Sequence, residues 1–141
     1  MAIAASLALL AGLSAGLLLS PGGSETDAPM LSAAVHEQLG TLPSDVKAGL
    51  PDGRRVRVVA SFTDGAGAFC REYETAAPGR TGYVGVACRE WAEWSLRFAM
   101  ATDSGTDGYA PASSMEALDA FYAATGASPL LATEAEREHL D

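Results

Sequence analysis

Four stretches in the middle of the chain alternate between apolar and polar residues, a pattern typical of strands in a sheet with one buried side. The alternation is clearest where every second residue from Val56 to Phe62, and again from Trp94 to Met100, is apolar. Short, turn-like connections separate the stretches and favour an antiparallel meander. The sequence therefore predicts four consecutive strands, namely Arg55–Phe62, Phe69–Thr75, Gly82–Arg89 and Trp94–Met100.

Helical spacing of apolar residues predicts helices before and after these strands. Leu31, Val35 and Leu39 are spaced four residues apart and indicate a short helix over Ser32–Leu39. A second helix is expected over Met115–Thr125, and its apolar stripe would cover the apolar face of the sheet. That stripe consists of Leu118, Phe121 and Tyr122.

The ends of the C-terminal helices are predicted from capping residues. Ser114 is the expected N-cap of the second helix, and Gly126 is expected to end it. Thr133 opens a last short helix, with Glu136 at the spacing of a capping box. The predicted fold class is thus α+β, with a four-stranded antiparallel meander packed by one or two C-terminal helices.

An apolar run, Ala2–Leu19, precedes this domain and predicts a transmembrane helix over residues 1–20. Its eighteen residues span roughly 27 Å as a helix, near the lower limit for crossing a bilayer. A basic start, which a signal peptide has, is missing, although a cleaved or uncleaved signal remains the alternative. Gly12 and Gly16 form a small-xxx-small pair, a candidate contact between two such helices. Residues 21–30 form a polar linker, and residues 31–141 form the predicted domain.

Composition narrows the classes of partner. The formal net charge is −9 and Lys47 is the only lysine. Nucleic-acid binding needs a basic face, so nucleic acid is not an expected partner. No phosphate-binding loop, Gly-x-Ser-x-Gly elbow or His-Glu-x-x-His motif occurs in the chain. The sequence therefore predicts a protein that is not an enzyme and uses no cofactor or metal.

The two cysteines lie on neighbouring predicted strands, Cys70 on the second and Cys88 on the third. Gly79 is the midpoint between them, so a hairpin centred on Pro78-Gly79 places the cysteines directly opposite each other. Cross-strand neighbours are within disulfide range, and a structural disulfide is the preferred interpretation. A metal site would need two more ligands, and a redox-active pair usually has much tighter spacing. The same register places Glu72 and Glu74 on the face of Val84 and Val86, which predicts a bulge or an exposed disulfide face.

Two further groups are candidate functional residues. Glu72, Glu74, Glu90 and Glu93 form a candidate acidic cluster near two strand ends, which could serve acid–base chemistry but is more often a solvated face. Trp94 is in phase with Leu96 and Phe98 and is expected in the core. Trp91 lies in a turn and is therefore the candidate for contact with a partner.

Several short segments together resemble the extracytoplasmic region of single-pass bacterial anti-sigma factors. They are Leu39–Ser44, Ala60–Phe62, Gly67–Tyr73, Gly85–Arg89 with Trp94, and Tyr109–Ala112 with the Leu118 helix that ends at Gly126-Ala127. The resemblance implies a cytoplasmic sigma-binding domain, one membrane helix and a periplasmic domain with paired cysteines, here Cys70 and Cys88. It also implies that this chain is the outer part of a longer regulator, so no sigma-binding residue is assigned.

The preferred interpretation is a regulatory or sensory domain in the bacterial inner membrane. The single-pass chain would have its C-terminal domain outside the cytoplasm. It would contact the membrane and a protein partner or protease, and a sigma factor only through an upstream domain. The first alternative is a secreted or periplasmic binding module whose signal peptide has been cleaved. The second is a small hydrolase that uses the acidic cluster.

Overall fold

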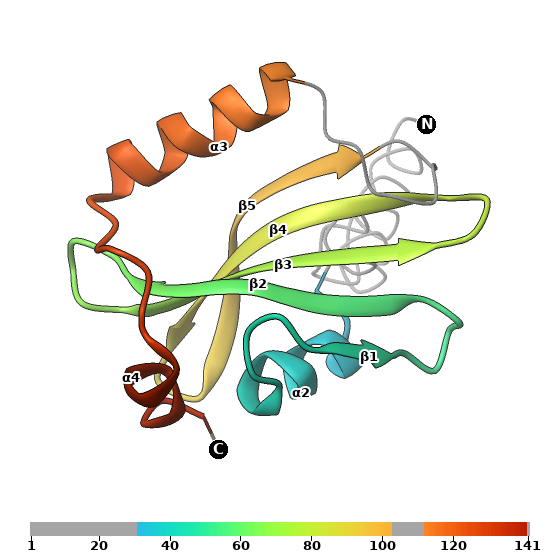
Figure 1. Cartoon of the computed structure of the whole chain (residues 1–141), viewed down its shortest axis with the longest axis horizontal. Coiled ribbons are helices and arrows are strands. Elements are labelled where there is room, and N and C mark those ends of the chain that lie inside the picture. Colours follow the sequence, from blue (N-terminus) through green and yellow to red (C-terminus); the bar gives the residue numbers. More distant parts are fainter. Residues whose placement is uncertain (1–30, 103–111, 141) are drawn as a thin grey trace, which may run out of the picture.

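The computed structural model describes residues 31–102 and 112–140 of the chain. These residues form a strongly twisted antiparallel sheet with helices on both of its faces (Figure 1). The predicted α+β class is confirmed. The predicted transmembrane helix over residues 1–20, with Gly12 and Gly16, and the linker over residues 21–30 lie outside the described residues. Within the described ranges, no helix is long and apolar enough to cross a membrane.

The sheet is a meander of five strands in the order β1-β2-β3-β4-β5, with every neighbouring pair antiparallel. The predicted count of four was wrong because β1 is only three residues long and has no apolar alternation. It pairs with the first residues of β2, where Ala48 lies opposite Val56. The strands are β1 (Lys47–Gly49), β2 (Arg55–Thr63), β3 (Phe69–Ala77), β4 (Arg80–Glu90) and β5 (Glu93–Thr102).

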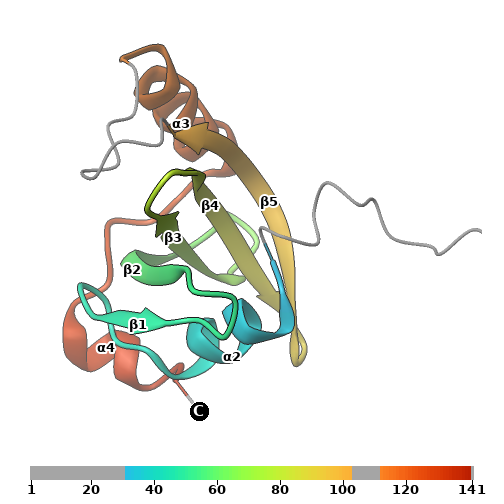
Figure 2. The same cartoon turned by 90° about the vertical axis from the view of Figure 1, so that its right-hand side faces the viewer.

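Helices cover the two faces of the sheet, with α3 on one face and α2 and α4 on the other (Figures 1 and 2). Ser32 is the N-cap of α2, and its Oγ accepts a hydrogen bond from the N–H of Val35. The predicted cap at Ser114 was wrong, because Ser114 lies inside α3, whereas Gly126 follows the end of the helix as predicted. The helices are α2 (Ala33–Thr41), α3 (Ala112–Thr125) and α4 (Thr133–Arg137).

Two β-bulges move the apolar alternation from one face of the sheet to the other. In β2 the register shifts between Val58 and Ala60, so Val58 lies opposite Tyr73 and Ala60 opposite Glu72. In β5 the pairing skips Arg97. The prediction of one continuous apolar face along each of these strands was wrong, because an extra residue reverses the side to which all later residues point.

The bulges give the sheet two separate hydrophobic clusters. The cluster on the α2 and α4 face contains Val56 and Val58 of β2 with Trp94 of β5. The cluster on the α3 face contains Phe62 of β2, the two cysteines and Leu118 of α3, with Phe98 of β5 packed against it. Phe121 and Tyr122 also pack there, so the predicted stripe of α3 does cover the sheet. Both faces of the sheet are therefore buried, rather than the single face that the sequence predicts.

Candidate functional site

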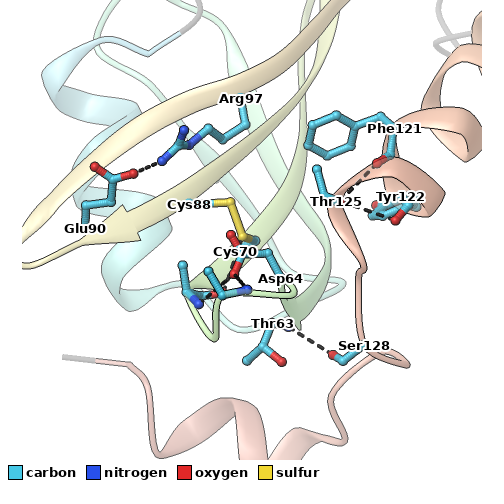
Figure 3. Close-up of a disulfide and its surroundings, with 12 residues drawn as sticks. Thr63, Asp64, Cys70, Cys88, Glu90, Arg97, Phe121, Tyr122, Thr125 and Ser128 are labelled. Carbon is cyan, nitrogen blue, oxygen red and sulfur yellow. Dashed lines mark hydrogen bonds and ion pairs between the residues drawn. A yellow bond between two sulfur atoms is a disulfide. The ribbon is translucent and has the colours of Figure 1, made fainter.

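The predicted disulfide joins β3 to β4 at the centre of the α3 face. Cys70 and Cys88 lie directly opposite each other, with 3.9 Å between their Cα atoms, and both side chains are buried. Figure 3 shows the disulfide beside the C-terminal end of α3, to the left of Thr125. The two cysteines are the only ones in the chain, and both belong to this bond. The hairpin register that the sequence predicts from Gly79 is thus correct.

A half-open cavity of about 450 Å³ lies directly over the disulfide. Beside it the C-terminal end of α3 is bonded to the β2–β3 turn, where the N–H of Gly65 donates to the carbonyl of Thr125 at 2.9 Å. A Cβ on Gly65 would lie 3.1 Å from that carbonyl oxygen, so the close approach favours glycine. The cavity is lined by Phe62, Asp64, Ala66, Cys70, Cys88, Arg97, Phe121 and Thr125.

Two charged side chains line this cavity. Asp64 begins the β2–β3 turn, and its Oδ1 accepts hydrogen bonds from the N–H groups of Ala66 at 2.9 Å and Ala68 at 2.8 Å. Arg97, the bulge residue of β5, forms an ion pair with Glu90 at the end of β4 (Figure 3). The cavity thus combines an oriented carboxylate, a paired guanidinium and a disulfide in its wall.

The four glutamates of the candidate acidic cluster do not converge on one point. Glu72 accepts a hydrogen bond from Tyr122 of α3, and Glu74 forms an ion pair with Arg57 at 3.2 Å. Glu90 pairs with Arg97, and Glu93 is exposed at the start of β5. Glu72 lies opposite Val86, four residues before Glu90 on β4. The four carboxylates therefore have different partners, although Glu72 and Glu74 are close enough for their charges to interact.

Glu72 is nevertheless an unusual group, because it is a carboxylate covered by α3. Burial raises the pKa of Glu72, and the charge of Glu74 adds to this increase, while the hydrogen bond from Tyr122 opposes it. Burial and the bond to Glu72 also raise the pKa of the Tyr122 hydroxyl above its ordinary value. The predicted alternative of an exposed disulfide face was wrong, because both cysteines are buried, whereas a bulge does occur beside Glu72, in β2 between Val58 and Ala60. The pairing of β3 with β4 is regular from Cys70 to Thr75, and Tyr122 of α3 is the polar partner of Glu72.

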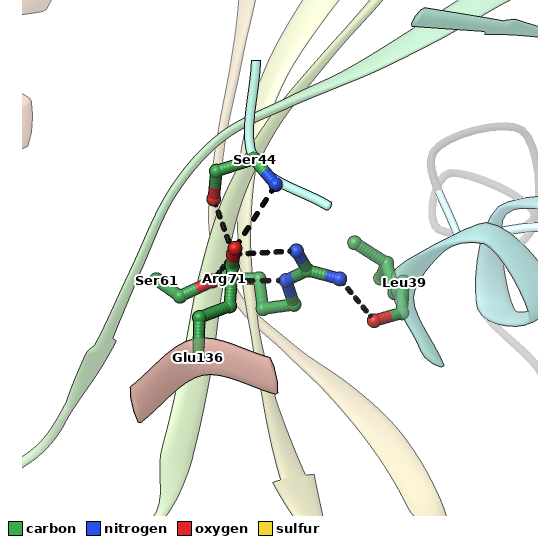
Figure 4. A network of polar contacts seen from close by, with 5 residues as sticks. All are labelled: Leu39, Ser44, Ser61, Arg71 and Glu136. Atoms are coloured by element: carbon green, nitrogen blue, oxygen red, sulfur yellow. Dashed lines mark hydrogen bonds and ion pairs between the residues drawn. The ribbon is translucent and has the colours of Figure 1, made fainter. Parts of the chain in front are cut away.

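A second buried polar site, on the opposite face, was not predicted from the sequence. Arg71 of β3 has no exposed surface, and its Nη2 lies 2.8 Å from Oε1 of Glu136 on α4 (Figure 4). The Arg71 guanidinium also donates to the Leu39 carbonyl at 2.6 Å and to Ser61 Oγ at 3.0 Å. The signal in the sequence is the position of Arg71 between Phe69 and Tyr73 on one side of a strand, where a lone charge requires a buried partner.

The carboxylate of Glu136 is the centre of this network. It accepts hydrogen bonds from Ser61 Oγ at 2.6 Å, from the Ser44 N–H at 3.2 Å and from the Ser44 hydroxyl. Burial by itself would raise the pKa of Glu136, but the hydrogen bonds from Ser44 and Ser61 and the charge of Arg71 lower it. The predicted capping box was wrong, because Glu136 faces the sheet and α4 has no side-chain cap. The network joins α4, α2 and the sheet.

Trp91 occupies the turn between β4 and β5 and is fully exposed. Its backbone has a φ of 62°, in the left-handed region that large side chains rarely adopt. Trp94, in contrast, is buried as predicted, with its ring 5.9 Å from that of Phe69. The structure therefore places a large apolar ring on a hairpin tip where neither burial nor backbone preference favours it.

Comparisons of the chain with protein-family models, curated proteins and solved structures find no match.

Proposed function

We propose that the domain is a non-enzymatic, partner-binding regulatory domain held at the bacterial inner membrane and facing out of the cytoplasm. The observation that carries this proposal is the buried disulfide between β3 and β4, since such bonds form and persist in oxidising compartments. The apolar run before the domain supports attachment to a membrane. In this role the chain would act like the extracytoplasmic part of the anti-sigma factors that its sequence resembles.

Trp91 is the proposed contact for a protein partner. Tryptophan is enriched among the residues that carry most of the energy of an interface. A large residue kept in a left-handed conformation is an outlier that points to function. Burying its ring removes about 150–250 Å² from water, or about 4–6 kcal/mol before the costs of association. Glu93 is exposed beside it, so a partner pocket with a neutral or basic rim fits best.

Membrane attachment and orientation are tested by expressing the chain in a bacterium with alkaline phosphatase fused to its C-terminus. We expect the fusion to be active, to stay in the membrane after alkaline carbonate extraction, and to have thiols that react only after denaturation and reduction. A shortened, soluble periplasmic product would instead support the secreted binding module. Free thiols in the native chain would contradict an oxidising location for the domain.

The contact is tested with a photo-crosslinking amino acid at position 91 in those cells. The same substitution at Leu130, which is 65% exposed, is the control for general surface proximity. We expect an adduct of defined mass from the crosslinker at position 91 and none from position 130. A crosslinker at position 93 should form the same adduct when Trp91 is present and should fail to form it in the Trp91→Ala variant. Equal adducts from positions 91 and 130, or an adduct that is insensitive to Trp91→Ala, would contradict the proposal.

A further inference from the structure

The disulfide and the β2–β3 turn bring together three groups that can bind a metal ion. A carboxylate oxygen of Asp64 and the Sγ atoms of Cys70 and Cys88 all lie within 4.8 Å of one another. Cys70 and Cys88 lie opposite each other on β3 and β4, and Asp64 lies in the turn that joins β2 to β3 (Figure 3). A tetrahedral zinc ion has bonds of about 2.0–2.3 Å, so the two sulfur atoms must move apart after reduction for one ion to bind both of them and Asp64.

We propose that the chain with its disulfide reduced binds one zinc-class divalent cation through Cys70, Cys88 and Asp64. Two thiolates and a carboxylate are a donor set that suits this borderline-soft ion. The inference does not depend on the proposed function, because it concerns only the reduced form of the protein. The sequence provides the two cysteines but not Asp64, whose place beside them follows from the turn.

Asp64 is already oriented by its backbone environment. The N–H groups of Ala66 and Ala68 both donate to Oδ1, so the carboxylate is fixed at the start of the turn. Hydrogen bonds of this kind hold a ligand in position and raise its affinity for a metal. Asparagine at this position keeps an Oδ1 that can accept the same two bonds, while it loses the charge. Asp64→Asn therefore separates metal binding from the structure of the turn.

The cavity provides the remaining requirements for the site. Its volume of about 450 Å³ leaves room for a water molecule as the fourth ligand, beside sulfur atoms that are otherwise enclosed. Arg97 also lines the cavity, but its charge is paired with that of Glu90. Binding exchanges two thiol protons for the metal charge, so the affinity should increase with pH.

The chemical step is a reversible exchange between a disulfide and a metal site. A dithiol reductant supplies two electrons and two protons, the Sγ–Sγ bond breaks, and the reductant becomes a disulfide while two thiols form. The cation then binds both sulfurs as thiolates and releases two protons to solvent. Reoxidation by a disulfide oxidant would expel the metal and restore the Cys70–Cys88 bond.

The test uses the full chain. It is reduced with a phosphine and titrated with cobalt(II) and then with zinc(II). We expect one equivalent of cobalt to give a thiolate-to-metal charge-transfer band that zinc abolishes, and native mass spectrometry to show one zinc with the loss of two protons. Loss of a residue that only supports a metal ligand lowers metal affinity by roughly 10–100-fold. Asp64→Asn removes a ligand charge, so it should weaken zinc affinity by at least that factor. Glu93→Gln, which removes an exposed charge on β5, should leave the affinity unchanged.

The proposal is overturned if the reduced chain gives no charge-transfer band. Binding of the same strength by the oxidised chain would also overturn it, since the site would then lie elsewhere, and so would equal binding by the Asp64→Asn variant, since Asp64 would then not be a ligand. Near-UV circular dichroism of the reduced chain follows its fold in each titration. If reduction unfolds the domain, zinc must restore the spectrum of the wild type and fail to restore that of Asp64→Asn. Equal recovery, or none in either protein, would contradict the proposal.

Discussion

Replacement of Glu136 by alanine should strongly destabilise the domain. The carboxylate accepts a hydrogen bond from Arg71 at 2.8 Å and further bonds from the side chains of Ser61 and Ser44. In Glu136→Ala the fully buried guanidinium of Arg71 keeps Ser61 and the Leu39 carbonyl but loses its counter-charge. Removing one member of a buried ion pair costs about 3–5 kcal/mol. Small domains are stable by about 5–15 kcal/mol, so the loss is a large fraction of the total.

Equilibrium unfolding in urea measures this loss, and a double-mutant cycle assigns it to the pair. Glu134→Ala on the same helix is the matched control and should change the free energy of unfolding by less than about 0.5 kcal/mol, because Glu134 is exposed. Arg71→Met combined with Glu136→Ala should cost less than the two single changes added together, with a coupling of about 2 kcal/mol or more.

The pH dependence of the Glu136→Ala effect gives an independent check. The folded state lowers the pKa of Glu136, so its contribution is fully present above the ordinary pKa of about 4.3. It is lost as the pH falls through the lower folded value, where the carboxylate becomes protonated. The difference between wild type and variant should thus shrink below about pH 4. A loss no larger than that of Glu134→Ala, or a coupling near zero, would refute the reasoning.

Three further predictions concern the other sites. The double variant Cys70→Ala/Cys88→Ala should have a free energy of unfolding about 3 kcal/mol lower, because it loses a disulfide that closes a loop between residues 18 apart. A decrease of less than about 1 kcal/mol in urea titrations would contradict this. The folded state raises the pKa of Glu72, so stability should fall as the pH rises from about 4.3 through the folded value. Glu72→Gln should remove that decrease in urea midpoints, and an unchanged slope would count against it. Trp91 has a φ of 62°, which glycine adopts without strain, so Trp91→Gly should increase the free energy of unfolding by up to about 1 kcal/mol and raise the melting temperature. A clear decrease in melting temperature would mean that the ring supports the fold.

Local patterns were sufficient to predict much of this fold. Four of the five strands follow from alternation, and the disulfide follows from a hairpin with Gly79 at the midpoint of the two cysteines. The turn alone does not fix this pairing. A register shift between Thr75 and Ala77 brings Cys70 opposite Cys88. The short helix over Ser32–Leu39 follows from the spacing of its apolar residues, and the end of α3 at Gly126 follows from capping chemistry. The predicted exposure of Trp91 and burial of Trp94 are confirmed.

The features that escaped prediction depend on single insertions or on distant partners. The bulges at Val59 and Arg97 leave the strand pattern intact in the sequence, yet they reverse the side on which each later residue lies. Glu136 lies 65 residues from Arg71, so no local spacing reveals their contact. Its position three residues after Thr133 instead imitates a helix cap. No local spacing reveals the position of Asp64 either, because only the β2–β3 turn brings it beside the cysteines.

The two bulges have a consequence for how the domain can open. Since they place Phe62 in one hydrophobic cluster and Val58 in the other, the sheet separates two clusters, each of which is covered by its own helix layer. Separation of α3 would widen the half-open cavity over the disulfide and expose the cluster around it, while the cluster behind α2 and α4 stayed buried. Native-state hydrogen exchange should therefore detect two independent opening units on opposite sides of one shared sheet.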